Sequence, residues 1–354
     1  MSIWTEWDPL LEVIVGDCFT YDQLDWDLPK KTAALFQQIL EESKEDLDNL
    51  SDYLSKMGVK VYRPKPKFNP QDIRISQFNI TLPTAPMVPR DQYMVYGNTV
   101  YQTYTSLTDR YVDSLSYYEI FKELFDQGYN WISQPPPELA NFPRDSSDWT
   151  NNGEDYYSVK YADKLLWHTA SMFKYGDAII SNYSPGTGLG LEWMKRNMPD
   201  TKIIVQNRFG HIDHGFFSLD DETIICDTKD WVPSQLSDKR IIAISPLLGQ
   251  RRNTKEISGG YLTGSIKLTD AWLETWLNEW KGYMQDVCFD FNPLVVDPKN
   301  VIFSNHQPKL FKLLESLGVN CHVCNLRHSA FWESGIHCVT LDLKRQGQRR
   351  SIVT

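Results

Sequence analysis

Three short segments of the sequence combine the residue types that chemistry needs. In residues 88–91, 210–215 and 334–342, polar side chains follow or interrupt an apolar run. In the second segment, an extended His211-Ile212-Asp213 would place His211 and Asp213 on one face, where both can line a single cavity. In the third, Cys338 follows a histidine, which is the minimum for covalent catalysis because a thiolate nucleophile needs a nearby base or cationic field. The pattern alone favours a buried structural cysteine at position 338.

Five predicted strands must position these segments. Each is short, rich in β-branched residues and ended by Gly, Asn or Asp, and they cover residues 12–16, 93–98, 178–182, 223–227 and 301–305. Four are followed by an amphipathic helical stretch, at residues 47–57, 117–125, 191–197 and 310–317, and then by a second apolar run. In the remaining unit only the second strand, residues 239–243, is clear.

Repetition of a strand–helix–strand unit about every 70 residues is typical of a radial or stacked arrangement. We therefore predict an α/β fold in which five units surround a central axis, as one domain over residues 1–354, with a funnel at the strand ends. Each unit would contribute one or two residues to a site there. A doubly wound α/β sheet is the alternative, but neither of its phosphate-loop patterns, G-x-G-x-x-G or G-x-x-x-x-G-K-[ST], occurs in the sequence.

Composition limits the partners. The chain of 354 residues has a formal net charge of −10 and no run of Lys or Arg longer than a doublet, so a nucleic acid is not an expected partner. The sequence shows no signal-peptide pattern and no apolar stretch near the ~20 residues that cross a bilayer. Six scattered cysteines predict reduced thiols. We expect a cytoplasmic protein that acts on small molecules, away from membranes, and the sequence leaves a homodimer open.

The motifs, taken in order, resemble the glycine amidinotransferase family, which includes the inosamine-phosphate amidinotransferases and is related to the arginine deiminases. The resemblance runs from residue 5 to about residue 347. It is carried by residues 5–16 (TEWDPLLEVIVG), 89–91 (PRD) with 97–98 (GN), 190–196 (GLEWMKR), 211–213 (HID) and 335–342 (GIHCVTLD).

The resemblance implies the pentein fold, a fivefold pseudo-symmetric α/β propeller, and transfer of the amidino group of arginine to glycine or another small primary amine. Cys338 matches the nucleophile of the family, His211 its general acid/base, and Asp91 and Asp213 the carboxylates that hold the guanidinium. Attack by the thiolate would release ornithine and leave an amidino-cysteine. No metal or organic cofactor is implied. A hydrolase of arginine or a related guanidine is the alternative enzyme, and a non-catalytic pentein that binds a guanidino compound or a protein is the alternative outside catalysis.

One departure from the family pattern motivates the non-catalytic alternative. His168 stands where the family has an aspartate that orients the catalytic histidine. Loss of this aspartate removes a carboxylate that would stabilise a protonated His211. Asp163 or Asp177 could supply the missing charge if the local register differs.

A run of metal-ligating residue types lies at Cys321-His322-Val323-Cys324. A structural zinc site needs a second pair of ligands, and only His328 and His337 lie nearby in the sequence. We therefore expect this run to be an alternating strand.

Overall fold

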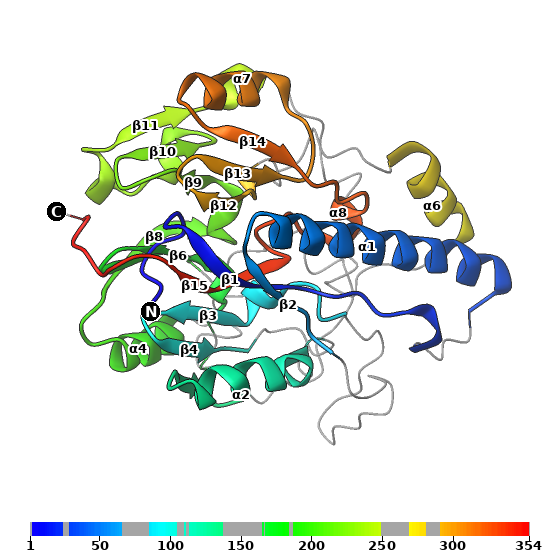
Figure 1. Cartoon of the computed structure of the whole chain (residues 1–354), viewed down its shortest axis with the longest axis horizontal. Helices are drawn as coiled ribbons and strands as arrows, with labels where there is room; N and C mark the ends of the chain where they lie inside the picture. Colours follow the sequence, from blue (N-terminus) through cyan, green and yellow to red (C-terminus); the bar gives the residue numbers. More distant parts are fainter. Residues whose placement is uncertain are drawn as a thin grey trace.

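The computed structural model contains five small sheets, each of three strands (Figure 1). It describes residues 2–23, 28–65, 85–104, 110, 113–136, 165, 167–183, 187–248, 269–280 and 291–353. In every sheet the central strand pairs antiparallel with one neighbour and parallel with the other. In strand order, the sheets are β15 (Thr340–Arg345), β1 (Leu10–Val15) and β2 (Lys60–Tyr62); β3 (Tyr93–Tyr96), β4 (Thr99–Gln102) and β5 (Asn130–Ser133); β6 (Met172–Tyr175), β7 (Ala178–Tyr183) and β8 (Lys202–Phe209); β9 (Phe216–Ser218), β10 (Thr223–Cys226) and β11 (Arg240–Ala243); and β12 (Leu294–Asp297), β13 (Asn300–Phe303) and β14 (Asn320–Val323).

The parallel pairs are joined by crossovers, four of which contain a helix. The helices are α1 (Lys30–Lys56), α2 (Tyr118–Asp126), α4 (Thr187–Asn197) and α7 (Pro308–Ser316). The fourth sheet has only the 3-10 turns η9 (Lys229–Trp231) and η10 (Ser234–Leu236) between β10 and β11, in the unit where the sequence shows no clear helix. The predicted mixed α/β units are therefore present, as five small sheets. Their ladders do not join into one closed sheet within the described ranges.

Helix α1 is much longer than the predicted stretch at residues 47–57, because it already begins at Lys30. Its apolar residues recur every three or four positions, so that one face is buried against the first sheet, with Phe36, Leu40 and Leu47 in the same cluster as Val13 and Val15 of β1. Three shorter α-helices are also described: α5 (Ser245–Leu248), α6 (Asp270–Thr275), which continues as a π-helical turn and packs on α1, and α8 (Ser329–Trp332). None of the helices in the described ranges combines the length and apolar character of a membrane span.

The two ends of the chain meet in one sheet, because β15 pairs with β1 (Figure 1). The N-terminal segment before β1 also bridges to two other sheets, through Ile3 to Gly97 after β3 and through Thr5 to Tyr175 in β6. Pairing between the first and the last strand ties the first unit to the end of the chain, and the N-terminal bridges hold the second and third units against it.

Candidate active site

The candidate residues occupy the same place in each sheet. Each lies in the short segment that precedes the outer strand that pairs antiparallel with the central strand. Asp91 ends the 3-10 turn η3 (Pro89–Asp91) before β3, and His168 precedes η7 (Thr169–Ser171) before β6. Asp213 lies in η8 (Ile212–His214) before β9, Asn292 precedes β12, and Cys338 precedes β15. The turn η3 contacts η7, and η7 contacts η8. Repetition of one sheet plan thus gathers residues that are far apart in the sequence.

His211, Asp213 and Cys338, three of the four predicted site residues, meet in a single cluster that also includes His214. The nitrogen, oxygen and sulfur atoms that these four side chains offer lie within 4.8 Å of one another. The expected extended His-Ile-Asp is wrong, because Ile212–His214 forms a 3-10 turn. With three residues per turn, positions 211 and 214 fall on the same side, and the two imidazole centroids are 5.2 Å apart.

Cys338 is buried and held by Asn292. The Asn292 side chain accepts a hydrogen bond from the Cys338 backbone N–H at 2.9 Å, and its Nδ2 donates to Sγ at 3.1 Å. Sγ also lies 3.5 Å from Oδ2 of Asp213. A Cβ on Gly335 would come within 2.6 Å of the Asn292 side chain, so this contact requires glycine at 335. Burial raises the pKa of the Cys338 thiol well above its usual value, and the charges of Asp213 and Asp91 raise it further.

Asp213 and Asp91 are buried carboxylates that each use one oxygen within the protein. His337 Nδ1 donates to Oδ2 of Asp213 at 2.8 Å, and Arg110 forms an ion pair with Oδ2 of Asp91. Burial alone would raise both pKa values, but His337 holds the pKa of Asp213 well below its usual range, and Arg110 lowers that of Asp91. Both groups are therefore ionised at neutral pH. Their Oδ1 atoms are buried without a hydrogen-bond partner among the described residues.

His168 lies beside His211, with the two ring centroids 6.4 Å apart. Burial, followed by the neighbouring His211, lowers the pKa of His168 to about 4. Of the two acids considered as a replacement charge, Asp177 sits between β6 and β7, where it pairs with Lys202 at 3.6 Å and accepts from Ser351. Asp163 lies outside the described residues. Residue 168 is thus a neutral imidazole.

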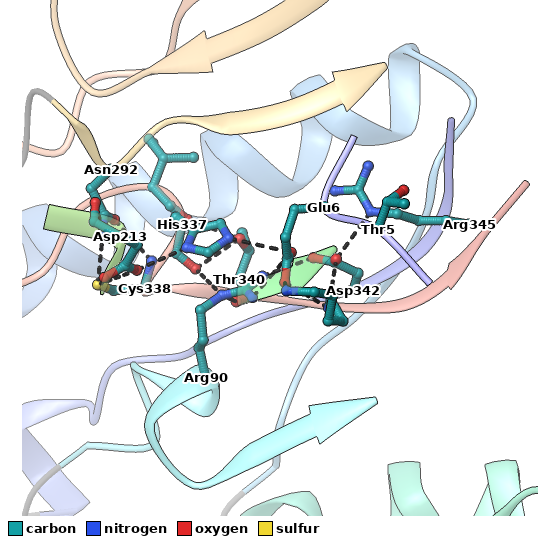
Figure 2. Close-up of polar contacts among 12 residues, drawn as sticks. Thr5, Glu6, Arg90, Asp213, Asn292, His337, Cys338, Thr340, Asp342 and Arg345 are labelled. Carbon is teal, nitrogen blue, oxygen red and sulfur yellow. Dashed lines mark hydrogen bonds and ion pairs between the residues drawn. The ribbon is translucent and has the colours of Figure 1, made fainter. Parts of the chain in front are cut away.

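A buried chain of polar contacts leads from this cluster into the core (Figure 2). Nε2 of His337 lies 3.5 Å from Glu6, whose other oxygen is 3.1 Å from Nζ of Lys174. Asp342 joins the same network through Lys174 at 3.0 Å and Arg90 at 2.8 Å. His337 therefore holds Asp213 in place, and the buried carboxylate of Glu6 positions His337.

Sequence reasoning missed three of the residues that shape the cluster, namely Asn292, His214 and Arg110, and it named His337 only as the neighbour of Cys338 and as a possible metal ligand. Asn292 carried a weak signal, since it precedes a proline at the start of a strand. Arg110 lies in a segment without periodicity and meets Asp91 only through the fold. The first three residues of the run at Cys321–Cys324 lie in strand β14, so the expected strand is present.

Comparison with known proteins gives these residues a context. No family model matches the chain. Over 98% of its length it is 26% identical to inosamine-phosphate amidinotransferase 1 of Streptomyces griseus, of which it covers 97%. It is 24% identical, over the same share, to the mitochondrial glycine amidinotransferase of Danio rerio, of which it covers 83%.

A solved structure of an inosamine-phosphate amidinotransferase from Streptomyces griseus matches all of this chain with a TM-score of 0.73, at 22% identity and 99% coverage of that chain. These likenesses confirm the resemblance that the motifs predict: over nearly its whole length the chain is similar to glycine and inosamine-phosphate amidinotransferases, and its mixed α/β fold of small sheets matches that of the solved amidinotransferase.

Proposed function

We propose that this protein transfers the amidino group of L-arginine to a small primary amine through an amidino-cysteine at Cys338. The observation that carries the proposal is the meeting of a thiol, an imidazole and an ionised carboxylate, with their reactive atoms within 4.8 Å. Relatives that cover nearly the whole chain are named for this chemistry. Glycine or another small amine is the acceptor in this proposal, and ornithine is the first product.

The two carboxylates provide the means to bind a guanidinium. A guanidinium is planar, always charged, and presents its N–H donors in a fixed fork that suits carboxylate oxygens. Oδ1 of Asp91 and Oδ1 of Asp213 are buried acceptors without a hydrogen-bond partner among the described residues. Donation from the substrate would satisfy both atoms, which offsets part of the cost of taking the cation out of water.

The same binding would activate the thiol. In the resting protein, burial and the negative charges of Asp213 and Asp91 hold Cys338 as the neutral thiol. A guanidinium between these carboxylates neutralises their field and favours the thiolate. The arrangement couples nucleophile formation to the presence of the donor, because the thiolate forms readily only when the cation is bound.

Proton transfer falls to His211. The proton of the thiol passes to His211, the sulfur bonds to the guanidine carbon, and the bond from that carbon to Nε of arginine breaks. His211 returns the proton to this nitrogen, so that ornithine leaves and amidino-Cys338 remains. The acceptor amine then gives a proton to His211 and attacks the amidino carbon. The carbon–sulfur bond breaks, and the proton returns to sulfur.

The proposal extends to the architecture. We infer that the five sheets are arranged in one ring about an axis, so that residues 1–354 form a single propeller domain. Support comes from the pairing of the first and last sheet strands in one sheet and from the contacts of η3 with η7 and of η7 with η8. In this arrangement each unit delivers its pre-strand segment to the axis, where the donor binds.

The test is to incubate the purified protein with L-arginine and glycine and to follow ornithine and guanidinoacetate. An inosamine phosphate, the acceptor class in the name of one relative, is run in parallel. Without acceptor, acid quenching should trap a peptide that contains Cys338 and is heavier by one amidino group. The matched control is Cys324→Ser, which changes a buried thiol in a different part of the fold.

Each outcome separates the alternatives. Ornithine with an amidinated acceptor, lost in Cys338→Ser and kept in Cys324→Ser, supports transfer. Citrulline with ammonia shows an arginine hydrolase. Absence of both products, with Cys338→Ala indistinguishable from the unaltered protein, leaves a pentein that binds a guanidino compound or a protein partner, an alternative motivated by His168.

A further inference from the structure

The cluster at η8 and the turn before β15 also has the composition of a metal site. It offers two imidazole nitrogens, one carboxylate oxygen and one sulfur from His211, His214, Asp213 and Cys338. Nitrogen and sulfur ligands with one carboxylate are the set that zinc prefers in tetrahedral sites. A thiolate and a carboxylate together carry two negative charges, which balance a divalent cation in a buried place.

The geometry is close to that of a bound ion. Bonds of about 2.0–2.3 Å to a tetrahedral zinc place its ligand atoms about 3.3–3.8 Å apart. The four atoms are already within 4.8 Å of one another. Rotations of the side chains that move each atom by less than about 1 Å would therefore complete the shell, without a change of the backbone.

The ligands are held in place before any ion arrives. The 3-10 turn η8 brings His211 and His214 to one side. His337 binds Oδ2 of Asp213 at 2.8 Å and leaves Oδ1, which is buried and has no hydrogen-bond partner among the described residues. Such an outer hydrogen bond is typical of metal-binding carboxylates. Asn292 fixes Cys338 from its other side.

We propose that this protein binds one Zn²⁺ ion through His211, Asp213, His214 and Cys338. Formation of the zinc–sulfur bond releases the thiol proton to solvent, with no change of oxidation state. The alternating run at Cys321–Cys324, which the sequence makes the more obvious zinc candidate, contributes to no comparable cluster among the described residues. Where the proposed function holds, zinc and arginine exclude each other, because both need the sulfur of Cys338 and the carboxylate of Asp213.

Binding is measured without arginine, so that its outcome does not depend on catalysis. The metal-free protein is titrated with Zn²⁺ against a chromogenic chelator, and with Co²⁺ to record the charge-transfer absorption of a thiolate–cobalt bond. The variants are His214→Ala and Cys338→Ser, with Cys324→Ser as the matched control, and thermal unfolding verifies that each one folds. Where His214→Ala does not fold, His214→Gln replaces it.

We expect one Zn²⁺ per chain, a loss of affinity of at least about tenfold in His214→Ala, and disappearance of the cobalt–thiolate absorption in Cys338→Ser. Cys324→Ser should bind as the unaltered protein does. Absence of saturable zinc binding, or affinity that falls only in Cys324→Ser, overturns the proposal. If the protein is active, zinc should raise the apparent KM for arginine. If the protein binds zinc but shows no transferase activity, the zinc site is supported and only the proposed function is rejected.

Discussion

At the position of residue 168 a neutral imidazole replaces the carboxylate that the family pattern expects. Its pKa is lowered to about 4 by burial and by the neighbouring His211, so it carries no charge at neutral pH. A neutral ring cannot stabilise protonated His211 as a carboxylate would, and that protonated state occurs in both halves of the proposed cycle. We therefore expect the proton-transfer step to be the step that a carboxylate at position 168 would accelerate most.

Replacing His168 with Asp should raise the kcat for ornithine formation by about tenfold or more, because a nearby carboxylate favours protonated His211. The matched control is His168→Asn, because asparagine has a similar shape to aspartate and carries no charge. Steady-state kinetics with arginine and glycine check the prediction. Equal rates in the two variants would show that charge at this position does not matter.

The pKa of His168 also predicts a pH dependence of stability. The ordinary pKa of histidine is about 6.5, and that of His168 in the fold is about 4. As the pH falls between these values, the unfolded chain takes up a proton and the folded chain does not. The contribution of His168 is thus fully present above pH about 6.5, and by pH 5 it has fallen by about 2 kcal/mol.

Urea unfolding at pH 7 and pH 5 measures this contribution. The quantity compared at each pH is the difference in the free energy of unfolding between the unaltered protein and His168→Asn. The unaltered protein should lose more free energy of unfolding on acidification than the variant, because only the unaltered protein carries the imidazole at position 168. An unchanged difference between the two pH values would contradict the assigned pKa shift.

At the scale of elements, the sequence located the strands with strong apolar runs and the amphipathic faces of α2, α4 and α7. It did not reveal the antiparallel partners β6, β9 and β12, because three or four residues are too few for a periodic pattern. The start of α1 at Lys30 was also missed. The acidic residues around Asp46 resemble a first turn, whereas Asp46 is buried within the helix and pairs with Arg327.

The site shows the same limit. Cys338, His211 and Asp213 stand in recognisable motifs, and the fold brings them together. Asn292 and Arg110 act through contacts that no local pattern records, since they meet Cys338 and Asp91 only when separate sheets pack. The candidate reactive residues could be picked out from the sequence, and the residues that hold them could not, because positioning depends on tertiary contacts.

The turn that carries Cys338 provides an element-scale prediction. Gly335→Ala places a Cβ where the Asn292 side chain lies, 2.6 Å away, so the turn or Asn292 must move. We expect a loss of about 1–3 kcal/mol in the free energy of unfolding. We also expect kcat to decrease by a larger factor than the factor by which KM changes. The Asn292→Gly background removes the clash, so Gly335→Ala should cost less there. Equal costs in both backgrounds would exclude the steric explanation.

At the scale of the whole molecule, a buried charge network joins parts of three sheets. Lys174 in β6 is fully buried between Glu6 of the N-terminal segment and Asp342 in β15, and Arg90 in the turn before β3 binds the same Asp342. Burial would raise the pKa of Asp342, but the surrounding cations hold it well below its usual value. The network also supports the site, because Glu6 contacts His337.

Removal of Lys174 should therefore affect both stability and chemistry. Lys174→Met keeps the length of the side chain but leaves Glu6 and Asp342 with less compensating charge, which should lower the free energy of unfolding by about 3–5 kcal/mol. The control is Lys122→Met, which breaks an exposed pair with Asp126 in α2 and should leave stability within experimental error. Urea unfolding measures both variants. A small loss in Lys174→Met, similar to that of the control, would show that the sheets are held by apolar packing alone. A large loss together with an elevated KM for arginine would indicate that the network acts through His337 to keep Asp213 ionised and aligned.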